Sequence, residues 1–339
     1  MSEPNHDVRR VFPRLQSAAG MRELNSPGHR RIVGESAAWK EVLTNATRVA
    51  ATEATVLLHG ESGTGKEVVA RFIHRASPRK DGPLVAINCA ALPETLLESE
   101  LFGYERGAFT GAYQTKPGQI ELASTGVLFL DEVSEMSRAA QAKFLRVLEE
   151  REFLRLGGTR LVKTNARLIA ATNRDLHAAI TSGTFREDLY YRLRVFDIRI
   201  PPLRERSGDV ALLTDAFLEE MVQTSGCPPV RVSEEVRRML AAYDWPGNVR
   251  ELRNVLERAA ILCGGGLIRP AHLSLQSTPA LSSSTADLGE IVRRQIEQTL
   301  RETCWNVSKS ARHLGLTRTQ LYGRLKKYRL ERPSHHVVS

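Results

Sequence analysis

The stretch that most constrains how this chain can fold is an eight-residue loop, GESGTGKE, at positions 60–67. It has the G-x-x-x-x-G-K spacing of a P-loop, in which backbone N–H groups surround a polyphosphate and the lysine adds positive charge. A β-type run at 54–58 precedes the loop, and apolar residues at helical spacing from Val68 to Ala76 follow it. This order places the anion at a helix N-terminus, which favours a phosphate loop over a simple glycine-rich turn. The residues expected to bind nucleotide are Gly60, Glu61, Ser62, Gly63, Thr64, Gly65, Lys66 and Glu67.

Short apolar runs separated mostly by amphipathic segments indicate the fold class. One such segment is Arg138–Glu150, whose apolar residues recur on one side of a helix. The alternation predicts an α/β fold with a mostly parallel, five-stranded sheet and helices on both faces. The predicted strands are 54–58, Leu84–Ile87, Val127–Leu130, Arg167–Ala171 and Val195–Ile200.

Polar residues stand where three of these strands end. Asn88 follows the second run, Asp131 and Glu132 follow the third, and Asn173 follows the fourth. In an open α/β sheet, ligands bind outside the carboxyl ends of the strands, so these residues should meet at the phosphate loop. An acidic pair at a strand end is often only a solvated turn. Beside a P-loop it resembles a Walker B element, in which Asp131 would hold Mg²⁺ directly or through water and Glu132 would polarise the attacking water.

Composition excludes several classes of protein. The 339 residues can form two or three domains, and no run of 18 apolar residues could span a membrane. The N-terminal segment MSEPNHDVRRVFPR lacks the apolar centre of a signal peptide. The four cysteines lack metal-type spacing, which is typical of reduced thiols in a cytoplasmic protein.

The chain is predicted to divide into five parts. They are a flexible lead at 1–31, an α/β subdomain at 32–200, a helical lid at 201–273, a low-complexity linker at 274–287 and a final helical unit at 288–331. From Pro201 onward the pattern is helical throughout. The helices expected in the lid are Asp209–Thr224, Ser233–Tyr243 and Asn248–Cys263, with Ser233 as an N-cap.

The final unit concentrates much of the net charge of +9, because between Asn306 and Arg329 it has seven basic residues and no Asp or Glu. A helix at 307–313, a turn at Gly315 and a helix from Thr317 predict a helix-turn-helix, whose second helix enters the DNA major groove. A solvated basic helix is the alternative, which the absence of acidic residues weakens. The predicted DNA contacts are Thr317, Arg318, Thr319, Gln320, Arg324, Lys326 and Lys327, with bases read by 318–320 and phosphates bound by 326 and 327.

Several motifs together resemble the sigma-54-dependent transcriptional activators, a family of AAA+ ATPases also called bacterial enhancer-binding proteins. The resemblance covers about residues 32–331, and its most specific element is GAFTGA at 107–112. The final unit is similar to the helix-turn-helix of the factor for inversion stimulation. The other matching motifs are GESGTGKE, INCAAL around Asn88, ATNRDL around Asn173, FREDLYYRL around Arg186 and Arg192, and WPGNVREL around Arg250.

The resemblance implies a role for each matching residue. Lys66 would contact the β- and γ-phosphates of ATP, Asp131 would serve Mg²⁺, and Glu132 would activate water. Asn88 would hold Glu132 in a switch position, and Asn173 would sense the nucleotide. An acidic residue at the position of Glu67 is usual in this family.

Three arginines receive roles only through the resemblance. Arg186 and Arg192 would act as arginine fingers on ATP in the neighbouring subunit, and Arg250 in the lid would sense the γ-phosphate of its own subunit. Each of them alone is more simply a solvated surface residue, because the chain has 48 Lys and Arg.

The GAFTGA segment has a physical reading of its own. A phenylalanine between glycines, on a segment too small and polar for a core, is a candidate contact site, with a locally buried aromatic as the alternative. In the family this loop rises from a hexameric ring and engages sigma-54. The residues expected to contact sigma-54 are Gly107, Ala108, Phe109, Thr110, Gly111 and Ala112.

The resemblance therefore implies an ATP-dependent activator that binds enhancer DNA as dimers at inverted repeats. It would use ATP hydrolysis to convert the closed complex of sigma-54 RNA polymerase into an open complex. The alternative is a DNA-binding regulator with a vestigial ATPase that acts without sigma-54, whereas a chaperone or helicase would not explain the helix-turn-helix. About thirty residues precede the ATPase, so no receiver domain is expected. We therefore expect control by another protein or by expression level, and not by phosphorylation within this chain.

Overall fold

The computed structural model describes residues 32–225 and 229–275, and single residues only in the C-terminal part. The chain divides into two compact units, 1–275 and 276–339. The predicted lead at 1–31 lies outside the described residues, as do most of the predicted linker and helix-turn-helix. The domain boundaries therefore remain predictions.

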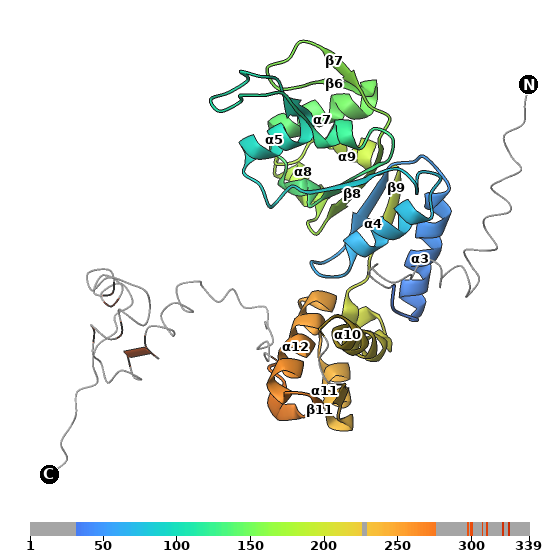
Figure 1. Cartoon of the computed structure of the whole chain (residues 1–339), viewed down its shortest axis with the longest axis vertical. Helices are drawn as coiled ribbons and strands as arrows, with labels where there is room; N and C mark the ends of the chain where they lie inside the picture. Colours follow the sequence, from blue (N-terminus) through green and yellow to red (C-terminus); the bar gives the residue numbers. More distant parts are fainter. Residues whose placement is uncertain are drawn as a thin grey trace, which may run out of the picture. The chain divides into compact units, whose positions relative to one another are not determined.

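A parallel five-stranded sheet, with strand order β2-β5-β8-β1-β9, forms the centre of the α/β part of the first unit. Strands β8 and β9 of this sheet are labelled in Figure 1. All five predicted strands are present, with ends that differ from the prediction by one or two residues, as is usual for element boundaries. The α/β prediction is therefore confirmed. The strands are β1 (Val56–His59), β2 (Leu84–Asn88), β5 (Val127–Asp131), β8 (Arg167–Thr172) and β9 (Phe196–Arg199).

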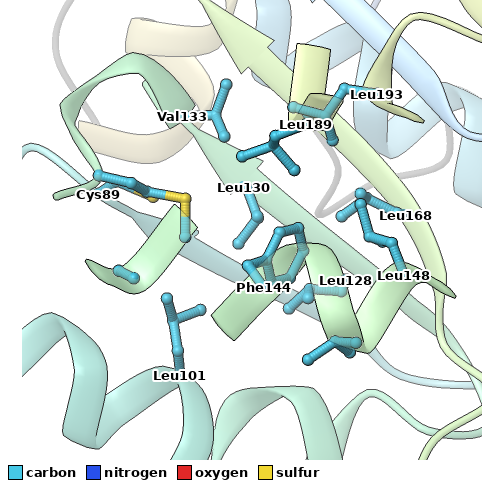
Figure 2. Packing of buried hydrophobic residues seen from close by; sticks show 14 of the residues in the cluster. Cys89, Leu101, Leu128, Leu130, Val133, Phe144, Leu148, Leu168, Leu189 and Leu193 are labelled. Carbon is cyan, nitrogen blue, oxygen red and sulfur yellow. The ribbon is translucent and has the colours of Figure 1, made fainter. Parts of the chain in front are cut away.

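Successive side chains of a strand point to opposite faces, so each face of this sheet has its own buried cluster. On one face, Leu128 and Leu168 pack with Phe144, which is 1% exposed (Figure 2). Leu57 belongs to the same cluster. Val56, Phe129 and Ile169 belong to the cluster on the other face. The helices of the first cluster are α5 (Glu94–Phe102), α7 (Arg138–Glu150), α8 (Leu176–Thr181) and α9 (Glu187–Leu193), and those of the second are α3 (Ala37–Ala50) and α4 (Lys66–Arg75).

Local capping explains where two of these helices begin. The Ser137 hydroxyl accepts a hydrogen bond from Ala140 N and starts α7 at the predicted residue. The Ser36 hydroxyl likewise accepts from Trp39 N and starts α3, a helix that the sequence analysis did not identify. The apolar face of α3 buries Trp39, Val42 and Val49 against the sheet.

Two small antiparallel pairs extend from the sheet subdomain. The first, β3 (Gly103–Tyr104) with β4 (Lys116–Pro117), brackets the segment at 107–112, and a short helix, α6 (Gln119–Leu122), follows. The second is the hairpin of β6 (Glu152–Leu154) and β7 (Leu161–Lys163).

The lid contains the three predicted helices, but the prediction of helices alone was wrong. Strand β10 (Val230–Val232) pairs in parallel with β11 (Gly266–Ile268), and both runs are too short to show a strand period in the sequence. Ser233 caps the second lid helix as predicted, accepting from Val236 N. Gly264 ends the third helix in the left-handed conformation, at φ 61°. The lid helices are α10 (Asp209–Ser225), α11 (Glu234–Ala242) and α12 (Asn248–Cys263).

The second unit contributes a few helical residues to the description. Leu300, Ser310 and Leu321 are helical and fully buried. Among the described residues, no helix is both long and apolar enough to cross a membrane. Two of the four cysteines, Cys89 and Cys263, are described, and both are free thiols.

Candidate functional site

The loop at 60–67 has the backbone shape of a phosphate cradle. Gly63 and Gly65 adopt φ values of 79° and 104°, which glycine accepts without steric cost, and Gly65 caps the N-terminus of α4. Lys66 is only 7% exposed, and its Nζ donates to the carbonyl oxygens of Gly60 at 2.9 Å and Glu61 at 3.3 Å. A buried cation at the start of a helix is suited to binding a polyphosphate.

The strand-end residues meet beside this loop, as the sequence predicted. Glu132 follows β5 in the left-handed conformation, at φ 53°. Its carboxylate accepts from Asn173 N at 3.0 Å and lies 3.5 Å from Lys66 Nζ. Asn88 Nδ2 donates to Asp131 Oδ2 at 3.4 Å. One cluster therefore joins the ends of β2, β5 and β8 to the phosphate loop.

The position of Asn88 differs in detail from the expected switch. Its amide group donates to Asp131 and accepts from Ala90 N, and it makes no hydrogen bond to Glu132 among the described residues. The reason is that the turn at Glu132 directs this carboxylate toward Asn173 and Lys66.

Asp131 has the features of a cation ligand. Its Oδ1 is buried and has no hydrogen-bond partner among the described residues. Burial, followed by the neighbouring charge of Glu132, raises the pKa of Asp131 above its ordinary value. A buried carboxylate oxygen without a donor fits Mg²⁺, which uses one or two protein carboxylates together with substrate phosphates. The donor set present is thus compatible with the predicted magnesium site.

The lid holds the phosphate loop directly. Asn248, which is fully buried, accepts from Leu203 N at 2.7 Å and donates to both Glu61 Oε2 and Ser62 O at 3.1 Å. Arg204 pairs with Glu61, and this hydrogen bond is the main reason that the pKa of Glu61 is lowered. The side chain of Glu61 thus binds the lid.

The predicted lid arginine also reaches the loop. Arg250 Nη1 donates to Ser62 Oγ at 3.0 Å, and Val249 N donates to Gly63 O at 3.1 Å. A Cβ on Gly63 would lie 2.4 Å from Gly247 O, so only glycine permits this contact. Arg250 therefore lies directly beside the phosphate loop.

The loop opens into a cavity of about 230 Å³ whose apolar end was not predicted. Val33, Trp39 and Phe217 line that end, and the Arg206 guanidinium stacks on the Trp39 ring at 4.0 Å. Arg206 is also paired with the buried carboxylate of Asp209 at 2.9 Å. Apolar and aromatic lining beside a phosphate loop is suited to a flat base.

The two finger candidates, both on or next to α9, lie outside the lining of this cavity. Arg186 is paired with Asp188 at 2.6 Å and lines a separate hollow with Arg138 and Tyr191. Arg192 Nη2 donates to the carbonyl oxygen of Leu148 at 3.3 Å. Neither arginine lines the cavity formed by the phosphate loop.

The GAFTGA segment forms an exposed loop. Gly107 N donates to Ala112 O at 2.8 Å and closes the loop, while Gly107 and Gly111 adopt positive φ values. Phe109 is 46% exposed, and its ring meets Tyr104 edge to face at 4.9 Å. Thr110 is also exposed. The residues that the sequence predicts to contact DNA, in contrast, lie outside the described part of the chain.

Comparison with known proteins identifies all three parts of the chain. Residues 32–199 match the sigma-54 interaction domain, and residues 204–288 match the AAA+ ATPase lid domain. Residues 288–328 match the Fis family of bacterial regulatory proteins. A crystal structure of NtrX from Brucella abortus in complex with ADP has a TM-score of 0.70 and 32% identity, covering 97% of this chain and 78% of that chain.

Curated proteins give the same result. Nitrogen fixation protein VnfA of Azotobacter vinelandii is 48% identical over 326 residues, 94% of this chain and 62% of that relative. Transcriptional regulatory protein ZraR of Escherichia coli is 45% identical over 299 residues, 87% of this chain and 68% of that relative. The chain spans about half to two thirds of the first three curated relatives. It belongs to the family of AAA+ regulatory proteins that carry a sigma-54 interaction domain and a Fis-type helix-turn-helix.

Proposed function

We propose that this chain is an ATP-dependent transcriptional activator that converts the closed complex of sigma-54 RNA polymerase into an open complex. The observation that carries the proposal is one folded unit that combines a nucleotide cradle with an exposed GAFTGA loop. The first can bind and hydrolyse ATP, and the second can contact a partner without disturbing the first.

Each residue of the cradle has a different role in ATP hydrolysis. Lys66 holds negative charge on the phosphates, and Glu132 accepts a proton from the attacking water. Asn173 orients Glu132 through its backbone N–H, while Arg250 approaches the γ-phosphate from the lid. The apolar end of the cavity beside Trp39 receives the adenine base.

Asp131 is the residue that would hold Mg²⁺, directly or through water. Its buried Oδ1 and its raised pKa support this assignment. When bound, Mg²⁺ neutralises charge on the phosphate oxygens.

Arg186 and Arg192 complete the active site of a neighbouring subunit in a ring, most simply a hexamer. The location of Arg186 in a hollow separate from its own cavity supports an action in trans. An arginine finger can raise the rate of phosphoryl transfer by roughly 10³–10⁵-fold.

The C-terminal unit delivers the ring to its promoter in the cytoplasm. Its basic helix-turn-helix binds inverted-repeat enhancer DNA as dimers, which raises the local concentration of the ring.

Open-complex formation in vitro tests the proposal. The purified chain with ATP should open a promoter bound by sigma-54 polymerase and should have no effect with polymerase that carries another sigma factor. Equal activity with both polymerases, or activity without ATP, would favour a DNA-binding regulator with a vestigial ATPase.

A further inference from the structure

We infer that Gln141 is a positioning residue that fixes the finger Arg186 against the loop that follows Glu132. The inference rests on the proposed action of Arg186 in trans. It assigns to a buried side chain of α7 the task of presenting the finger to the neighbouring subunit.

The first support is the burial of this amide group. Gln141 lies in the second turn of α7 and is 0% exposed. Glutamine is mostly an exposed residue, and a buried amide is retained only where hydrogen bonds replace water. The surroundings of this side chain must therefore supply partners for its donors and its acceptor.

The second support is the identity of those partners. Gln141 Nε2 donates to Met136 O at 2.8 Å and to Thr184 O at 3.0 Å. Gln141 Oε1 accepts from Arg186 N at 2.9 Å. One amide group thus joins three backbone positions on two segments, and both of its donors are used.

The two segments have different tasks. Met136 ends the short turn that begins after Glu132, whose carboxylate lies against Lys66 and Asn173. Arg186 is the N-cap of α9. The Gln141 amide therefore connects the turn that follows Glu132 in one subunit to the arginine that would serve the next.

Apolar packing holds Phe185 and the body of α9, but it supplies no hydrogen-bond acceptor for Arg186 N. Leu189 and Leu193 are buried in the same cluster as Val133 (Figure 2). Arg186 precedes them at the helix N-terminus, where backbone donors lack partners within the helix. The Gln141 acceptor supplies that partner, and Asp188 then orients the guanidinium.

Replacing Gln141 should consequently displace the finger while sparing the cradle of the same subunit. Gln141→Met keeps the size of the side chain and removes all three hydrogen bonds. A displacement of about 1 Å at a group that approaches the transition state can lower the rate roughly 10²-fold. We expect kcat to fall by about that factor and the Kd for ATP to stay within about twofold.

Mixing subunits tests the inference directly. Lys66→Ala lacks a working cradle but keeps its finger, so adding it to Gln141→Met should restore ATPase activity above the sum of the two alone. Mixing Gln141→Met with Arg186→Ala should restore nothing, because both lack a presented finger. Gln119→Met, at a glutamine that is only partly buried, should behave as the unmodified protein does.

The control mixture separates the two proposals. If Arg186→Ala and Lys66→Ala do not complement each other, the action of Arg186 in trans is wrong. If they do and Gln141→Met does not complement Lys66→Ala, the inference about Gln141 is wrong. If Gln141→Met fails to bind ATP, the same mixing experiments should be carried out with Gln141→Glu. Loss of ATP binding in both variants would show that Gln141 serves folding alone and would overturn the inference.

Discussion

The phosphate loop at 60–67 and the GAFTGA loop at 107–112 are both glycine-rich, yet the structure holds them in opposite ways. Asn248, Val249 and Arg250 of the lid donate to the first loop, and its lysine is 7% exposed. The second loop is closed by its own backbone, and a Cβ on Gly107 or Gly111 would meet no atom within 4 Å.

This difference separates two uses of glycine. In the phosphate loop, Gly63 permits close packing that fixes donors around a charged ligand. In the GAFTGA loop, Gly107 and Gly111 adopt positive φ values in open space, and the turn between them leaves Phe109 46% exposed. The phosphate loop needs donors that are in place before the ligand binds, and the GAFTGA loop needs a side chain that a partner can reach.

Glu132→Gln should have the largest effect on the cradle. Loss of a general base lowers kcat by roughly 10²–10⁴-fold, while ATP should still bind because Lys66 remains. Single-turnover ATPase and nucleotide-binding assays measure the two effects separately. Glu149→Gln, on the exposed face of α7, is the matched control. Wild-type turnover by Glu132→Gln would remove this carboxylate from the chemistry.

Asn248→Ala should loosen the phosphate loop from the lid. It leaves the buried Leu203 N–H without its acceptor, and such a loss costs about 1–3 kcal/mol. Chemical denaturation should show that decrease in the free energy of unfolding, together with weaker ATP binding. Asn254→Ala, on the exposed side of the same helix, should change neither. Unchanged ATP binding in Asn248→Ala would show that the lid does not hold the loop.

Asp131→Asn should have the smallest effect on stability, with the sign opposite to that of Asn248→Ala. Because the pKa of Asp131 is raised in the folded protein, its charge opposes folding at pH values above that pKa. The variant without nucleotide should melt roughly 2–4 °C higher at neutral pH, and the gain should shrink as the pH falls through the raised pKa. Mg²⁺-dependent ATP hydrolysis should be lost. Asp81→Asn is the exposed control, and a lower melting temperature for Asp131→Asn would contradict the conclusion that the charge of Asp131 opposes folding.

Local sequence patterns predicted the parts of the site that depend on strand ends. Asn88, Asp131, Glu132 and Asn173 each follow an apolar run, and the parallel sheet brings them together. The motif around Arg250 also predicted its position near the phosphate loop.

The remaining parts depend on contacts between distant segments. The Asn248–Glu61 hydrogen bond joins residues 187 positions apart, and no local period reveals it. The turn signal Pro-Gly-Asn at 246–248 predicts a break before α12 but does not predict which residue Asn248 contacts. Trp39 and Arg206, which meet at the apolar end of the cavity, likewise come from distant segments, and the sequence analysis did not identify the helix that carries Trp39.

Coupling between the two loops is tested most directly by measuring ATPase activity and open-complex formation in the same reaction with Phe109→Ala. The matched control is Leu267→Ala in the lid, because Leu267 is 45% exposed and Phe109 is 46% exposed. We expect Phe109→Ala to hydrolyse ATP within about twofold of the unmodified rate and to form no open complex, because it lacks the contact side chain and keeps the cradle. Leu267→Ala should retain both activities. Normal promoter opening by Phe109→Ala would contradict the assignment of this loop as the contact with sigma-54.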